Sequence, residues 1–216
     1  MSIVRSAWIV IALAVAGCAE TAAAPEQARQ AAPQQARQAA SGQAGQATPP
    51  GTASPMTVRA HGLTAELPPG WLAASESLTP HLTDPREELA VGTYPLRYRQ
   101  TECAHMPGSA LEALGPGDAF VTLEERGLGV PDGAADFPSR PARFGPALGG
   151  PSEAGACAPG AHFIDHWFGF SDGGRHFHVL VAFGPQASAE VQRQAWAILD
   201  GLRVDPGVTP DWQSSG

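Results

Sequence analysis

The stretch of sequence that decides the fold is residues 162–183, which reads HFIDHWFGFSDGGRHFHVLVAF. Two runs rich in aromatic and β-branched residues, 162–170 and 176–183, flank a short polar segment. An Asp-Gly pair between two such runs is typical of a β-hairpin. A two-residue turn at Asp172-Gly173 or at Gly173-Gly174 brings the large apolar residues of both strands to one face. These residues are Ile164, Phe168, Phe170, Phe177, Val179, Val181 and Phe183. We therefore predict a long antiparallel hairpin with one apolar face.

The hairpin is followed by a predicted helix over residues 188–201. Ser188 is a favourable N-cap residue. Apolar residues recur after it at helical spacing and form one stripe, made by Val191, Ala195, Ile198, Leu199 and Leu202. We expect this stripe to lie across the hairpin.

Shorter elements are predicted on the N-terminal side of the hairpin. Residues 58–67 favour a strand or a hairpin, and residues 119–126 favour a strand. Residues 89–96 also favour a strand, and Pro95 places it at an edge of the sheet. Residues 107–114 favour a short helix that begins at a proline and ends before Gly-Pro.

Residues 127–161 are dominated by Gly, Pro and Ala, so we expect a long loop with room for one short strand at Phe144. Together these patterns predict a single globular α+β domain over residues 56–205. It contains an antiparallel sheet of about five strands, with the C-terminal helix and the short helix packed on it. Residues 206–216 are expected to be a flexible tail.

The N-terminus has the layout of a secretory signal peptide at residues 1–17. Its apolar part is about a dozen residues, fewer than the roughly 20 that a helix needs to span a bilayer. Val15-Ala16-Gly17-Cys18 resembles the lipobox of bacterial lipoproteins. This resemblance implies cleavage before Cys18, a diacylglyceryl group on its thiol, and anchoring to the cell membrane on the extracytoplasmic side. The alternatives are an ordinary signal peptide cut at residues 19–24 and a chance cysteine in an apolar run.

Residues 19–55 contain no Val, Ile, Leu, Met, Phe, Trp, Tyr or Cys. Such a segment cannot form a core. We expect residues 18–55 to be a disordered tether rich in Ala, Gln and Pro, with a random-coil span on the order of 30 Å. A low-complexity insertion without a selected length is the alternative.

The net charge of the chain limits the classes of partner that we expect. The net charge is -8, and all 13 basic residues are arginine. Nucleic-acid binding is driven by basic residues that displace phosphate counterions, so we predict no nucleic-acid partner. The expected partners are the membrane, through the lipid anchor, and an unidentified envelope protein or small ligand.

The cysteines predict a disulfide. Setting Cys18 aside leaves Cys103 and Cys157, an even pair in an oxidising compartment. In the chain-entropy model their bond would stabilise the domain by roughly 4 kcal/mol. The alternatives are two buried free thiols, or a nucleophile made of Cys103 and His105.

A metal site is the second hypothesis, built on the histidines of the hairpin. The predicted register places His176, His178 and Asp165 on one face, where they could form a three-ligand zinc or copper site. The opposing interpretation is that these are polar strand positions in a chain that lacks Lys and Asn. We therefore assign no metal and no cofactor, and keep these residues as candidates only.

Catalytic patterns are weak. No Gly-x-Ser-x-Gly occurs, so a secreted hydrolase is a distant alternative, and we predict no catalytic residue and no enzyme activity. The acidic pairs Glu87-Glu88 and Glu124-Glu125 consist of neighbours that point to opposite faces of a strand, so the two members of a pair cannot share a substrate. We expect both pairs at solvated strand ends.

Three features of the domain together resemble a known superfamily. They are Glu66-Leu67-Pro68-Pro69-Gly70-Trp71 near its start, the late hairpin, and the ending Ile198-Leu199-Asp200-Gly201-Leu202-Arg203-Val204. In this order they resemble PsbP-like proteins, which are α/β/α sandwiches and include bacterial lipoproteins. The resemblance covers the two ends of the domain. It implies a non-catalytic binding or envelope-assembly role on an antiparallel sheet, with no catalytic residues to carry over.

Overall fold

The computed structural model describes residues 54–101, 103, 106–127 and 135–206. The predicted signal peptide, Cys18, the tether up to residue 53, His105 and the tail from residue 207 lie outside these residues. The chain divides into two units, Met1–Ala47 and Thr48–Gly216, and every described residue belongs to the second.

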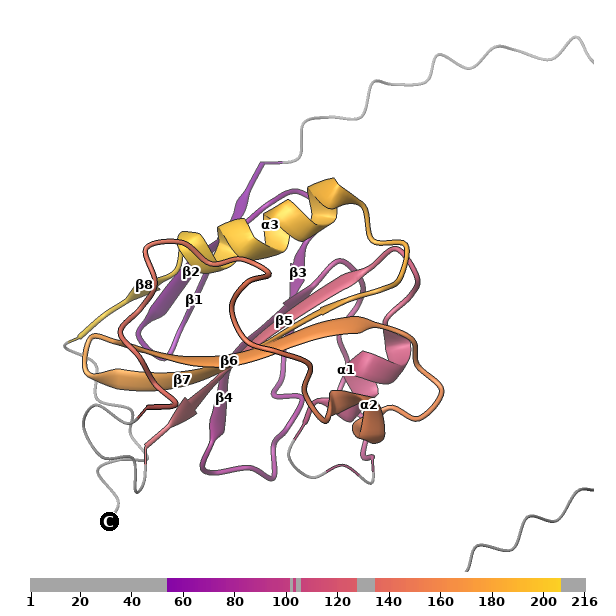
Figure 1. Cartoon of the computed structure of the whole chain (residues 1–216), viewed down its shortest axis with the longest axis horizontal. Helices are drawn as coiled ribbons and strands as arrows, with labels where there is room; N and C mark the ends of the chain where they lie inside the picture. Colours follow the sequence, from indigo (N-terminus) through magenta and orange to yellow (C-terminus); the bar gives the residue numbers. More distant parts are fainter. Residues whose placement is uncertain (1–53, 102, 104–105, 128–134, 207–216) are drawn as a thin grey trace, which may run out of the picture. The chain divides into compact units, whose positions relative to one another are not determined.

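The larger sheet of the described domain has five antiparallel strands in the order β3-β4-β5-β7-β6 (Figure 1). The strands are β3 (Leu72–Ala73), β4 (Arg86–Gly92), β5 (Ala119–Arg126), β6 (Ile164–Asp172) and β7 (Arg175–Phe183). β5 and β7 are buried along most of their length because they occupy central positions. This sheet confirms the predicted α+β class and its antiparallel strands.

The predicted hairpin is β6 and β7. Gly173 and Gly174 form the two-residue turn with φ of 59° and 79°, left-handed values that glycine adopts without steric cost. Asp172 therefore pairs with Arg175, and Phe170 pairs with Phe177. The apolar residues of both strands share one face, as predicted.

A second sheet corrects the expectation of a single one. β1 (Met56–Ala60), β2 (Leu63–Leu67) and β8 (Arg203–Val204) form a three-stranded antiparallel sheet in the order β1-β2-β8. The predicted element at residues 58–67 is thus a hairpin, which turns at His61 and Gly62. β8 has only two residues, too few for a periodic pattern, and it pairs with β2 through Leu63 and Val204.

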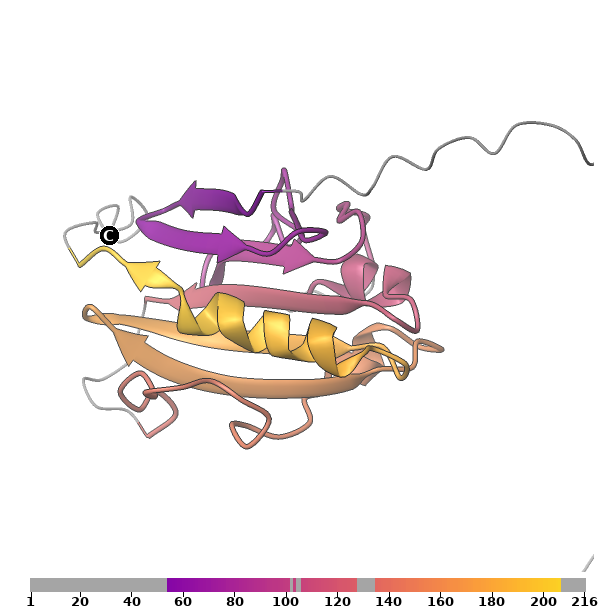
Figure 2. The ribbon, with the colours of Figure 1, turned by 90° about the horizontal axis from the view of Figure 1, so that it is seen from above.

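The helices occupy both faces of the five-stranded sheet. α3 (Ala189–Asp200) begins after Ser188, whose Oγ accepts a hydrogen bond from the Val191 backbone N–H. α3 and the three-stranded sheet lie on one face, here called the α3 face (Figure 2). α1 (Gly108–Ala113) and α2 (Ala154–Cys157) lie with the second core on the other face, here called the α1 face. The two predicted helices are therefore present, but on opposite faces.

Each face has its own apolar core. On the α3 face, side chains of β2, α3 and the sheet pack together, among them Leu67, Val121, Phe170, Val179, Trp196 and Ile198. On the α1 face the buried residues include Ala90, Leu111, Phe120, Leu180 and Cys157. The central strands contribute to both cores, so β5 and β7 hold the layers together.

The long segment before β6 contains no strand at Phe144 within its described part, residues 135–161. Phe144 is instead a core residue whose ring lies 5.3 Å from that of Phe170. The segment crosses the outer edge of β6, with isolated bridges from Ser139 to Ser171 and from Gly150 to Trp167. These bridges occupy backbone groups of an edge strand that would otherwise be open to another chain.

Arg140 fixes this segment to the end of α3. Its guanidinium donates hydrogen bonds to the carbonyl oxygens of Leu199 and Leu202 at 2.8 and 2.7 Å, and to Asp172 Oδ2 at 2.8 Å. A cation at a helix C-terminus is favourable because of the helix dipole. Among the described residues, the helices are all too short or too polar to cross a membrane.

Candidate functional site

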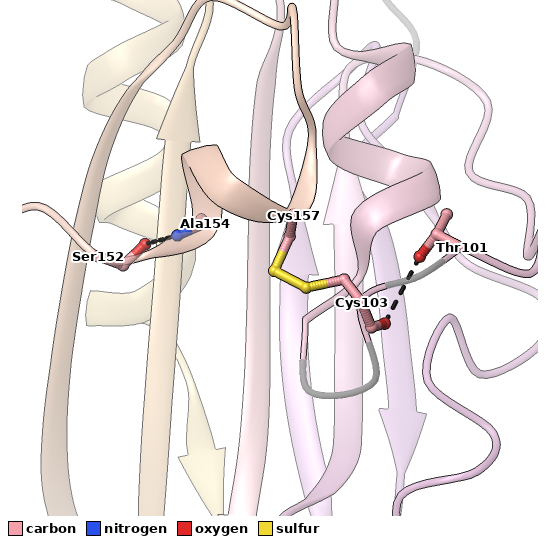
Figure 3. The surroundings of a disulfide bond; sticks show 5 residues. All are labelled: Thr101, Cys103, Ser152, Ala154 and Cys157. Atoms are coloured by element: carbon pink, nitrogen blue, oxygen red, sulfur yellow. Dashed lines mark hydrogen bonds between the residues drawn. A yellow bond between two sulfur atoms is a disulfide. The ribbon is translucent and has the colours of Figure 1, made fainter.

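The predicted disulfide is present. Cys103 and Cys157 are bonded, with their Cα atoms 5.1 Å apart (Figure 3). The bond connects α2 to the segment that precedes α1, so it attaches the long segment before β6 to the rest of the domain. Thr101 Oγ1 donates to the Cys103 carbonyl at 3.5 Å, and Ser152 Oγ accepts from the Ala154 N–H at 2.9 Å.

A cavity of about 920 Å³ opens beside the disulfide. It is bordered by both cysteines and by Arg99, Gln100, Thr101, Glu112, Ala156 and Pro159. Arg99 and Glu112 form an ion pair across its rim. The volume falls within the range of small-molecule sites, although its lining is more polar than theirs usually is.

The candidate metal ligands share a face but do not converge. Asp165 lies opposite Ala182, whereas His178 lies opposite Gly169, four residues further along β6 and therefore about 13 Å away. Asp165 Oδ2 accepts from the Ser152 N–H at 2.6 Å. Within the described part of the chain, no group of three His, Cys, Asp or Glu side chains is placed to hold a metal ion.

The two histidines have other contacts. The His178 ring stacks on Phe137 with ring centres 4.7 Å apart, and the edge of Trp167 meets it at 4.9 Å. Gly169 makes this stacking possible, because a Cβ there would collide with the carbonyl of Asp136, which precedes Phe137. Burial lowers the pKa of His178, so its ring is neutral at pH 7.

His176 and Ser171 form a contact that resembles a hydrolase dyad. Their Nδ1 and Oγ atoms are 2.9 Å apart. However, Ser171 Oγ donates its proton to the Phe137 carbonyl at 2.7 Å. His176 Nδ1 must then be the donor toward Ser171, which is the reverse of what a general base requires. This pair is therefore structural.

The four paired glutamates do not lie in the environment that the sequence predicts. Glu88, Glu124 and Glu125 are only 4%, 1% and 0% exposed, so the expectation of solvated strand ends is wrong. Adjacent members do point to opposite faces, as predicted. Their partners are instead on neighbouring strands: Glu87 lies opposite Glu124, while Glu88 and Glu125 both reach Arg175.

On the α3 face, Arg175 pairs with both buried carboxylates, and Arg86 also lies near Glu88. The Arg175 Nε and Nη2 donate to the two oxygens of Glu125 at 2.9 and 2.7 Å, and Nη2 lies 3.8 Å from Glu88 Oε2. Nη1 donates to the His61 carbonyl at 3.0 Å. A bidentate pair of this kind is strong and directional. It connects β4, β5 and β7 to the turn of the β1-β2 hairpin.

On the α1 face, Glu87, Glu124 and His178 occupy one row across β4, β5 and β7, here called the acidic row. Both oxygens of Glu124 are buried and, within the described residues, have no hydrogen-bond partner. The same holds for Thr122 Oγ1, two residues earlier on that face. The Glu87 carboxylate accepts from the Leu78 N–H at 3.0 and 3.1 Å.

Burial changes the ionisation of this row. It raises the pKa of Glu87 to about 7 and the pKa of Glu124 to about 8, the latter also through the nearby charge of Glu87. Glu124 is therefore mostly protonated at pH 7. Because Glu124 is almost fully buried, it cannot touch a substrate. The sequence carries no local signal for this burial, because Glu87-Glu88 precedes the apolar run 89–96 and Glu124-Glu125 lies near the end of the predicted strand 119–126.

The chain matches no known protein-family profile and no curated protein sequence.

Proposed function

We propose that this chain is a lipid-anchored, extracytoplasmic protein with a non-catalytic binding or envelope-assembly role. The observation that carries the proposal is the Cys103–Cys157 disulfide. Disulfides form and persist in oxidising compartments outside the cytoplasm. The lipobox pattern at Val15-Ala16-Gly17-Cys18 supports the same location independently. Cys18 is not part of the disulfide, so its thiol is available for lipid attachment.

A non-catalytic binding role fits the contacts of the polar side chains, because these contacts are made within the domain. Asp165, Ser171 and Arg175 are each engaged by neighbours in the domain, so their polar groups serve the fold. The resemblance to PsbP-like proteins is part of this proposal and points to the same role. We place the ligand or partner at the cavity beside the disulfide, where Gln100 is exposed at the rim.

Site-specific photo-crosslinking in the native envelope tests this proposal. A photoreactive residue is introduced at Gln100, and as a matched control at Gln192, an exposed glutamine on α3. We expect one discrete adduct from position 100 that is absent from position 192. No adduct at position 100, or the same adducts from both positions, would contradict the placement of the binding site.

A further inference from the structure

Glu124 stands out on the α1 face because a carboxyl group is buried there without a hydrogen-bond partner among the described residues. Glu87 lies directly opposite it on β4. Like charges on directly opposed strand positions repel, and a buried environment strengthens the repulsion. The orphan hydroxyl of Thr122 on the same face offers it no established hydrogen bond. The two carboxyl groups therefore cannot both ionise without a large cost.

Cations near the acidic row do not remove this cost. His178, opposite Glu124 on β7, is held neutral by burial. Arg126 is the next residue of β5 on this face, and its Nε lies 3.9 Å from Asp84 Oδ1. The other charged or titratable groups around the row are Asp136 before Phe137, His176 on β7, and His61, Glu76 and Arg86, which line one pocket with Glu87. The Arg86 Nε atom lies 3.7 Å from Glu88 Oε1 and so pairs with the carboxylate of the α3 face. Most of these groups are carboxyl or imidazole side chains rather than permanent cations.

Glu87 also holds a piece of chain against the sheet. Residues 76–84, here called the covering segment, precede β4, and the Leu78 N–H and Thr79 Oγ1 donate to the Glu87 carboxylate. Leu78 and Thr79 are buried at 2% and 1% exposure. Glu87 therefore holds these two residues in place, together with the apolar contacts of Leu78 in the core of the α1 face.

We propose that Glu87 and Glu124 form an electrostatically coupled pair that holds one proton, and that loss of this proton to solvent loosens the covering segment from the sheet. With one proton on the pair, Glu87 keeps its hydrogen bonds to Leu78 and Thr79 while Glu124 is neutral. When the proton leaves, two adjacent buried carboxylates repel each other, and Glu87 is the less buried of the two. Glu87 then moves toward solvent, and its hydrogen bonds from Leu78 and Thr79 are lost.

The sign of the pH effect follows from the two carboxyl groups. Burial raises the pKa of both above the ordinary value of 4.5, to about 7 and about 8. The folded protein therefore binds more protons than the unfolded chain between these values. Stability from this pair is present at low pH and is lost as the pH rises through the folded pKa values.

Urea unfolding between pH 6 and pH 9 tests the site, using the wild-type chain, Glu124→Gln and Glu190→Gln. Glu190 is an exposed residue of α3 and serves as the matched control. Relative to Glu124→Gln, the folding equilibrium constant of the wild type should fall by about tenfold or more over this range. Glu190→Gln should follow the wild type. Parallel curves for wild type and Glu124→Gln would overturn the proposal.

Hydrogen exchange gives the local readout. After correction for intrinsic rates, amides of residues 76–84 should exchange at least about threefold faster at pH 9 than at pH 6, while those of α3 should not change. Glu87→Gln removes the opposing charge, and it provides a second variant if Glu124→Gln does not fold. A wild-type pH response in Glu87→Gln, or unchanged exchange in the covering segment, would contradict the proposal.

Discussion

At the residue scale, Arg175 is the side chain that allows two carboxylates to be buried on the α3 face. It is 5% exposed and holds Glu125 in a bidentate pair. Removing one partner of a buried ion pair leaves the other charge without compensation, and this is far more costly than replacing both partners by apolar residues.

We therefore expect Arg175→Met to lower the free energy of unfolding by about 3–5 kcal/mol. The double variant Arg175→Met with Glu125→Leu should recover a large part of this loss. Urea denaturation at pH 7 measures both. The ion pair would have no such role if the single variant cost less than about 1 kcal/mol, or if the double variant were no more stable than the single one.

The same residues show how far sequence alone can go. The alternation of Glu124 and Glu125 between faces follows from strand geometry and was predictable. Their burial was not predictable, because it depends on the central position of β5 and on Arg175. Arg175 lies in a hairpin that comes later in the sequence. A carboxylate beside an apolar run has the same local pattern whether its strand is central or at an edge.

At the scale of elements, α3 depends on its first turn. Ser188 Oγ accepts from the Val191 N–H at 3.2 Å and satisfies one of the free backbone donors. Ser188→Ala should therefore lower the free energy of unfolding by about 1 kcal/mol. Ser75→Ala, at an exposed serine outside the helices, is the matched control and should have almost no effect. Equal effects of the two substitutions in thermal unfolding would argue against the cap.

The disulfide is the connection between α2 and the segment before α1. Replacing both Cys103 and Cys157 by serine should lower the free energy of unfolding by roughly 2–4 kcal/mol, because the bond closes a long loop in the unfolded chain. Adding a reductant to the wild-type protein should reproduce the loss, and the serine variant should not respond to it. A loss below about 0.5 kcal/mol would mean that the bond does not hold this part of the fold.

Elements with a local signal were predictable, and those defined by a partner were not. The β6-β7 hairpin and α3 carry their turn, cap and periodicity within one stretch. The strand predicted at residues 89–96 is β4, which begins at Arg86 and lies between β3 and β5 rather than at an edge. Its charged first residues and the irregularity between Glu87 and Leu89 hid its true start from the sequence pattern. β8 becomes a strand only because β2, far away in the sequence, lies beside it.

At the scale of the whole molecule, every described strand and helix lies between Met56 and Val204. Apolar burial stabilises a domain of this size, and the segment before it offers almost no apolar side chains. A chain without residues 1–53 should therefore unfold within about 5 °C of the full mature chain in a thermal scan. A larger decrease would mean that residues before Met56 contribute to the fold.

The arrangement of the two sheets was not predictable from local patterns. The smaller sheet is completed by pairing of Leu63-Thr64 with Arg203-Val204, which lie at opposite ends of the domain sequence. The compartment, in contrast, is a proposal that rests on a few residues. Cys18 in its lipobox context and the even pair Cys103 and Cys157 lead to the same location by different chemistry. Our central proposal is that the protein is located at the membrane.

Intact mass spectrometry of the protein extracted from the membrane fraction tests that claim most directly. We expect a mature chain that begins at Cys18, carries the added mass of a diacylglyceryl group on that residue, and contains Cys103 and Cys157 in oxidised form. A chain that begins at any other residue, or one without acyl mass, would contradict lipid anchoring.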